Sequence, residues 1–181
     1  SLKDLQYNVS FLDDDCIAEG GEFFFLPKEN ILLAGQNRNN LKGAEQMAEK
    51  LKVSRLHIIK SSGYHLDTSI TPIFNKKYDC IGIICAREVF RNNEINDLRN
   101  ICISNQWDLI EIEHPNINSS LSFRTAMNGL TLPGLFIGSK KLNQKPISDF
   151  ALSNGITFDS TEVSQFNLSG GSVHCLTNEL F

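Results

Sequence analysis

Short apolar runs separated by turn residues recur along the chain, and each run is long enough for a strand. Residues 23–26 and 31–34 are two such runs, and the sequence Pro27-Lys28-Glu29-Asn30 between them is typical of a hairpin turn. Apolar residues then recur at helical spacing over 41–51, where Asn39 or Asn40 can cap the helix. A further strand is expected over 56–59. The predicted order is strand, strand, helix, strand.

The same order returns in the middle of the chain. Strands are predicted over 69–74, 79–86 and 108–112, and an amphipathic helix is predicted over 94–104. Pro72 lies inside the first of these runs, where it favours an edge strand or a break because proline cannot donate a ladder hydrogen bond.

A third pass of the pattern follows. Residues 130–132 and 135–137 predict two strands, and the helix after them has Pro146 in its first turn and Gly155 just beyond its end. A short strand over 156–158 closes the pass. A last strand is predicted over 173–180, and it carries Cys175.

Repetition of one supersecondary unit indicates a repeated architecture. A unit of this kind cannot bury its own apolar face, so several units must pack around an axis. We therefore expect an α+β fold in which strand-strand-helix-strand units surround a central channel.

Composition restricts the classes of function that remain. The chain has 181 residues, enough for one domain, and its net charge of −4 argues against a nucleic-acid-binding protein. No apolar run reaches bilayer length, and the first residues lack the pattern of a secretion signal. Five cysteines cannot all pair, and Cys80, Cys85 and Cys102 lie in apolar stretches. These features predict a cytoplasmic protein, and no Cys/His spacing suits a metal site.

Three segments carry candidate chemistry. Glu19 precedes two glycines, His65 begins the sequence His-Leu-Asp-Thr, and Cys175 follows the glycine-rich segment near the end of the chain. An acid, a histidine and a cysteine are the components of an activated thiolate site. Taken one at a time, each residue has an ordinary structural explanation: Cys175 is more typical of a buried strand, His65 of a surface position, and Glu19 of a turn before two glycines.

Taken together, these segments resemble the guanidino-group-modifying, or pentein, superfamily. That family includes arginine deiminase, dimethylarginine dimethylaminohydrolase, agmatine deiminase and glycine amidinotransferase. The matching stretches appear in the order of the family and cover nearly the whole chain: Glu19-Gly20-Gly21-Glu22, Gly35-Gln36-Asn37-Arg38-Asn39-Asn40 with Gly43-Ala44, His65-Leu66-Asp67-Thr68, Asn128-Gly129-Leu130 and the segment 170–177.

The resemblance also has departures. It implies five units, of which this sequence shows about three, and the first unit with its substrate-binding acid is not found. We therefore expect a single domain over 1–181 that is incomplete at its N-terminus. Two kinds of partner remain open: further copies of the same chain in a homo-oligomer, or another chain that supplies the missing unit. Glu22 stands where relatives carry Asp, and Asn37-Arg38-Asn39 stands where they often carry Ser-x-Arg-Thr.

The resemblance implies a role for five side chains. Cys175 would be the nucleophile, His65 the general acid and base, and Glu19 the carboxylate that orients His65. Asp67 would accept hydrogen bonds from the guanidinium, and Arg38 would bind a substrate carboxylate, although a solvated loop arginine is an equal alternative. His174 is expected to point to the opposite face from Cys175, because neighbours alternate along a strand.

Three functions remain open at this stage. The first is a cysteine-dependent hydrolase that acts on the guanidino group of arginine or a methylated arginine through a covalent thiouronium. The second is an amidinotransferase that passes the amidino group to an amine. The third is a non-catalytic protein of the same fold that binds a small guanidino compound. No metal or organic cofactor is expected, because the thiolate supplies the chemistry.

Overall fold

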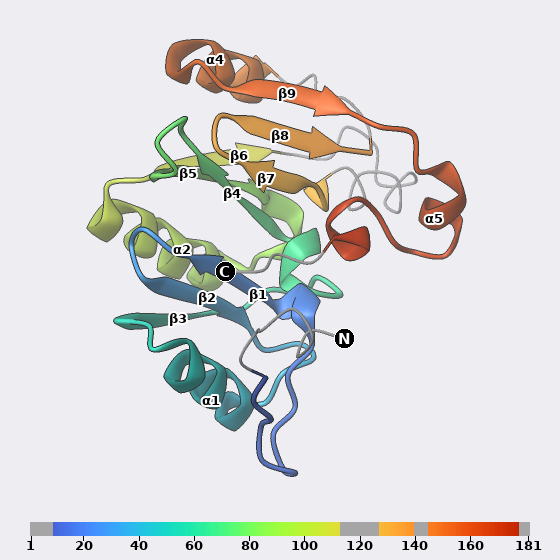
Figure 1. Ribbon diagram of the computed structural model, residues 1–181. Coiled ribbons are helices and arrows are strands. Elements are labelled where there is room, and N and C mark those ends of the chain that lie inside the picture. Colours follow the sequence, from blue (N-terminus) through green and yellow to red (C-terminus); the bar gives the residue numbers. More distant parts are fainter. Residues whose placement is uncertain (1–8, 113–126, 140–144, 178–181) are drawn as a thin grey trace.

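Three small sheets, each built in the same way, make up the computed structural model, which describes residues 9–112, 127–139 and 145–177. In every sheet the middle strand pairs antiparallel with the strand before it and parallel with the strand that follows the helix. Figure 1 shows the three sheets one above another in sequence order. The predicted α+β fold of repeated strand-strand-helix-strand units is confirmed.

The bounds of the elements agree closely with the hydrophobic pattern. The first unit contains β1 (Phe23–Leu26), β2 (Ile31–Gly35), α1 (Leu41–Leu51) and β3 (Arg55–Ile59). The second contains β4 (Ile70–Phe74), β5 (Cys80–Ala86), α2 (Asn92–Asn105) and β6 (Asp108–Ile112). The third contains β7 (Leu130–Leu132), β8 (Leu135–Gly138), α4 (Lys145–Asn154) and β9 (Thr157–Ser160).

The described residues also form short helical elements outside the strands and the longer helices. They are the 3-10 turns η1 (Gly20–Glu22), η2 (Leu66–Thr68), η3 (Arg87–Val89) and η5 (His174–Leu176), together with the short helix α5 (Ser164–Leu168).

Local signals explain where the helices begin and end. Of the two asparagines considered as caps, Asn40 is the N-cap of α1, and its side chain accepts a hydrogen bond from the backbone N–H of Gly43. Gly155 follows α4 with φ of +64°, a left-handed conformation that glycine adopts without steric cost. Pro72 lies on β4, which pairs only with β5 within its sheet, so the edge-strand prediction is confirmed.

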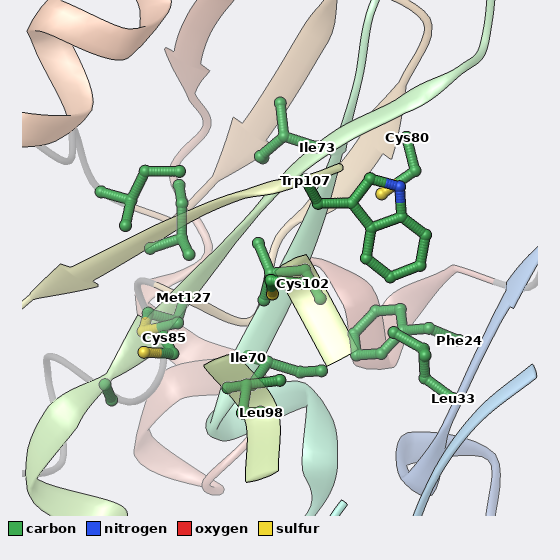
Figure 2. Packing of buried hydrophobic residues seen from close by; sticks show 14 of the residues in the cluster. Phe24, Leu33, Ile70, Ile73, Cys80, Cys85, Leu98, Cys102, Trp107 and Met127 are labelled. Atoms are coloured by element: carbon green, nitrogen blue, oxygen red, sulfur yellow. The ribbon is translucent and has the colours of Figure 1, made fainter. Parts of the chain in front are cut away.

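One apolar core joins the three units. Figure 2 shows part of this cluster, with Phe24 and Leu33 from the first unit, Leu98 from the second and Met127 just before β7. Phe136 and Ile147 of the third unit belong to the same cluster. The predicted burial of Cys80, Cys85 and Cys102 is confirmed, since all three belong to this cluster. Backbone contacts also cross between units, as where Gly134 N–H donates to the carbonyl of Phe74.

The predicted strand over 173–180 is wrong in the part that the structure describes. His174–Leu176 form η5, closed by a hydrogen bond from the N–H of Leu176 to the carbonyl of Val173, and residues 178–180 lie outside the described ranges. The segment enters this turn from Gly170, whose φ of +84° is incompatible with an extended run. Cys175 is therefore presented by a tight turn.

None of the helices in the described residues is both long enough and apolar enough to span a membrane.

Candidate functional site

The segments around Glu19, His65 and Cys175 converge on one cavity of about 440 Å³. Figure 1 shows η1, η2 and η5 close together beside the strands, although the three turns are far apart in sequence. One wall of the cavity is polar and one is apolar. The polar wall holds His65, Asp67, His174, Cys175 and Thr177, and the apolar wall holds Phe23, Phe25, Leu32, Met47 and Leu51.

Glu19 and His65 form a hydrogen-bonded pair. The Oε2 atom of Glu19 lies 2.7 Å from Nε2 of His65, as expected for an acid that orients a histidine. Glu19 is held by Asn39, whose Oδ1 accepts from the backbone N–H of Glu19 at 2.8 Å. His65 is held by the turn that follows, because the Thr68 hydroxyl donates to the His65 carbonyl at 2.8 Å. Both partners are thus fixed by their own backbone surroundings.

Asp67 is the buried charge of the site. It lies in η2 with only 1% of its surface exposed, and its Oδ2 atom contacts Nδ1 of His174 at 3.0 Å. Its Oδ1 atom is buried and has no hydrogen-bond partner within the described ranges. A buried carboxylate oxygen without a donor is costly, so this atom is suited to a ligand that brings N–H groups.

Cys175 is exposed, and its Sγ atom lies 3.9 Å from Oδ2 of Asp67. Asn128 holds two consecutive backbone N–H groups of the turn that carries the sulfur: its Oδ1 accepts from the N–H of Cys175 at 3.2 Å, and its carbonyl accepts from the N–H of His174 at 3.1 Å. Asn128 is buried next to β7, so the third unit positions the thiol.

His174 faces the cavity beside Cys175, which corrects the prediction that the two side chains point to opposite faces. Alternation applies to a strand, whereas in the tight turn η5 successive side chains are only about a third of a revolution apart. The ring of His174 packs against Phe24, with 5.2 Å between ring centroids. The site therefore contains two histidines, each paired with a carboxylate.

Gly21 makes the close approach of these groups possible. A Cβ atom at this position would lie 2.6 Å from Nδ1 of His65, closer than real Cβ atoms approach, and 3.0 Å from Oδ2 of Asp67, a tight contact. A Cβ atom on the neighbouring Gly20 would have no other atom within 4 Å. Only the second glycine is required by packing against the site.

Glu22 is a buried carboxylate that joins the loops under the site. Its Oε1 accepts from the backbone N–H of Arg38 at 2.6 Å, and its Oε2 accepts from that of Leu66 at 3.0 Å. Burial raises the pKa of Glu22 above its ordinary value, against the opposing effect of these two donors. Glu22 thus ties the Gly35 loop to the turn that carries Asp67.

Arg38 does not line the cavity. Its side chain is exposed and lies over the ring of Tyr64, with Cζ 4.2 Å from the ring centroid. Tyr64 in turn packs against His65, with 4.6 Å between ring centroids. The Tyr64 ring therefore lies between Arg38 and His65.

The sequence pointed to Glu19, His65, Asp67 and Cys175, which the structure brings together, and it missed the supporting residues. From the sequence, Asn39 is predicted only as a possible helix cap, and Glu22 stands only as a departure from the family. His174 is predicted to point away from Cys175 because a strand is expected, although the preceding pair Gly170-Gly171 signals a turn. No group of three or more histidine, cysteine or acidic side chains within the described ranges could hold a metal ion.

Comparison with solved structures identifies the fold. The N-terminal domain of ArgZ bound to product, an arginine dihydrolase from the ornithine-ammonia cycle in cyanobacteria, matches with a TM-score of 0.73 and 20% identity. The match covers 96% of this chain and 60% of that domain. Another crystal structure of the ArgZ domain, with a TM-score of 0.74 and 20% identity over the same shares of the two chains, is covalently bound to a reaction intermediate.

Two further structures extend the comparison. AgrE in a ternary complex with ornithine and NAD⁺ matches with a TM-score of 0.75 and 21% identity, over 96% of this chain and 24% of that one. SxtG, an amidinotransferase from Microseira wollei in the saxitoxin biosynthetic pathway, matches with a TM-score of 0.61 and 22% identity, over 86% and 42%. No protein-family model matches the chain, and no curated protein matches it significantly. The chain has the pentein-type fold and spans about 60% of the ArgZ domain.

Proposed function

We propose that this protein modifies the guanidino group of arginine or a methylated arginine through a covalent bond to Cys175. The observation that carries the proposal is the buried Oδ1 of Asp67, which has no donor among the described residues and belongs to the same carboxylate that lies 3.9 Å from the thiol. Such an acceptor suits the N–H groups of a planar cation, and it would hold the cation's carbon beside the sulfur. The pentein-type fold, shared with an arginine dihydrolase and an amidinotransferase, gives further support.

The first step forms a bond between sulfur and carbon. The Cys175 thiolate attacks the guanidinium carbon, and the tetrahedral centre then expels an amine. His65 gives a proton to that leaving amine, and a cationic thiouronium remains on the sulfur. Glu19 holds Nε2 of His65, which leaves Nδ1 for the proton transfer.

The second step releases the product. Water attacks the thiouronium carbon and gives a proton to His65, and the carbon–sulfur bond breaks to restore the thiolate. The product is a ureido compound. If an acceptor amine attacks in place of water, the amidino group is transferred and no ureido compound forms. The chain is similar in structure to a dihydrolase and to an amidinotransferase, and this is compatible with attack on the thiouronium by water or by an amine.

Arg38 is also proposed to bind the carboxylate of the substrate. It lies outside the cavity wall and is stacked on Tyr64, so it would have to leave this ring or act at the cavity mouth. Replacement by leucine is expected to raise KM for arginine and leave KM for agmatine, which lacks the carboxylate, unchanged. Equal effects on the two substrates would remove Arg38 from the site.

The experiment uses the full gene product, because the chain spans only part of the related domains. It is incubated with arginine, methylated arginines and agmatine, and ureido product, ammonia and ornithine are measured with and without added glycine. Cys175→Ala should lower turnover by about 10⁴-fold or more, whereas Cys16→Ala, outside the cavity wall, should retain it. Ornithine that forms only with glycine indicates transfer. Binding without turnover indicates the non-catalytic alternative and contradicts the proposal.

A further inference from the structure

One oxygen of Asp67 is shared between a histidine and the cysteine. Oδ2 lies 3.0 Å from Nδ1 of His174 and 3.9 Å from Sγ of Cys175, whereas Oδ1 has no partner within the described ranges. The carboxylate is almost fully buried, so water does not compete for these contacts. The two oxygens of one side chain therefore have different surroundings, and His174 makes the shorter of the two contacts to Oδ2.

The His174 ring is held from two sides. Its backbone N–H donates to the carbonyl of Asn128, and its ring packs on Phe24 of β1. The ring thus reaches Asp67 from a fixed turn, and the third unit and the first unit both restrain it. A ring held in this way can orient a carboxylate, because neither partner is free to rotate away.

A carboxylate near a thiol opposes ionisation of that thiol. Two negative charges at this distance repel each other, and burial strengthens the repulsion. An N–H donated to the carboxylate withdraws part of its charge. Besides Asp67, the titratable side chains that line the cavity with Cys175 are His65 and His174. Behind them, Glu19 contacts His65, and Glu22 accepts from the backbone N–H of Leu66. Within the described residues, the side chains hydrogen-bonded to Asp67 are those of His174 and Cys175.

We propose that His174 is a positioning residue that acts through Asp67. By donating from Nδ1 to Oδ2, it keeps Oδ1 directed to the substrate cation and lowers the electrostatic cost of forming the Cys175 thiolate. The first consequence rests on the proposed function. The second is a property of the free protein and can be measured without substrate.

The test compares three substitutions of one side chain. His174→Asn places an amide N–H near the position of Nδ1, His174→Gln places one near Nε2, and His174→Leu removes the donor but keeps an apolar contact with Phe24. The rate at which iodoacetamide alkylates Cys175 is measured against pH. At pH 7 the leucine and glutamine variants should react about tenfold more slowly than the natural protein, and the asparagine variant should stay within about threefold of it.

A double-mutant cycle shows whether the effect passes through Asp67. In an Asp67→Asn background, His174→Leu should change the alkylation profile by less than about twofold, because the carboxylate charge is already gone. With substrate, His174→Leu should raise KM for arginine by about tenfold, because the free oxygen is no longer fixed.

Several results would overturn the proposal. One is an alkylation profile that the leucine variant leaves unchanged while its folding is intact. Another is an equal slowing by asparagine and leucine, which would indicate a role in packing alone. If no guanidine is turned over, the proposed function fails, and the alkylation profile still decides the role of His174 at the thiol.

Discussion

Cysteine sulfur occurs in two regions of this molecule with opposite surroundings. Cys85 lies in β5 within the apolar core, where burial raises the pKa of its thiol far above the ordinary range, and burial raises the pKa of Cys102 to about 12. Cys175 lies on an exposed turn beside a carboxylate and two imidazole rings. The difference teaches that the neighbours of a thiol, and not its residue type, decide whether it packs or reacts.

The same comparison holds for the histidines. His57 lies in β3, where burial lowers its pKa, and its Nε2 atom is buried without a partner among the described residues. His65 and His174 each face a carboxylate in the cavity. A paired imidazole can hold or pass a proton, whereas an unpaired buried imidazole is held neutral.

The largest expected effect is a difference in alkylation rate between the two kinds of cysteine. At pH 8, Cys175 should react with iodoacetamide at least about 10³-fold faster than Cys80, Cys85 or Cys102, because the buried thiols are neither ionised nor accessible. Mass spectrometry of the labelled peptides over time measures the four rates. Similar rates in folded protein would remove the contrast between the regions.

The next effect concerns the fit of the site around Gly21. Gly21→Ala should lower kcat/KM for the guanidino substrate by about 10²-fold, because the new methyl group would displace His65 or Asp67. Gly20→Ala is the matched control, since open space surrounds that position, and it should keep activity within about threefold. An equal loss in both variants would show that the turn, and not the close approach, matters.

A smaller effect is expected when the buried region is made polar. Cys85→Ser should lower the free energy of unfolding by about 1–3 kcal/mol, because a hydroxyl loses its hydrogen bonds to water in this core. Urea denaturation measures the change, and Cys175→Ser should alter stability by less than about 0.5 kcal/mol. Turnover by the folded fraction of the Cys85 variant should be unchanged. The substitution in the core would then affect stability alone, and the substitution at Cys175 would affect activity alone.

The smallest effect is a pH dependence from Glu22. Because its folded pKa is raised, Glu22 binds its proton more tightly in the folded protein, and its contribution to stability is lost as pH rises through that pKa. The free energy of unfolding should therefore fall less steeply above about pH 4.5 in the Glu22→Gln variant than in the natural protein. At low pH the variant should be less stable by about 1 kcal/mol, because one hydrogen-bond acceptor is lost. Glu49→Gln on the exposed surface of α1 is the control. An unchanged slope in the Glu22 variant would show that its carboxylate is not the titrating group.

Much of the fold could be predicted from the sequence, since apolar runs and helical spacing mark elements locally. The turn at 27–30, the cap before α1 and Gly155 after α4 follow from the conformational preferences of single residues. The strand predicted over 173–180 is wrong in the described residues 173–177, because Gly170 and the hydrogen bonds of η5 close a turn there. Tertiary contacts from Asn128 complete that turn, and they cannot be seen in the local pattern.

By itself the sequence determined the strand-strand-helix-strand repeat and the identity of four residues at the site, because both depend on residue type and order. Only the tertiary structure decided that His174 reaches Asp67, that Asn39 and Glu22 support the loops, and that Arg38 lies outside the cavity wall. The reason is physical. Periodicity records which residues are buried, but the direction of a side chain in a turn depends on hydrogen bonds from distant segments.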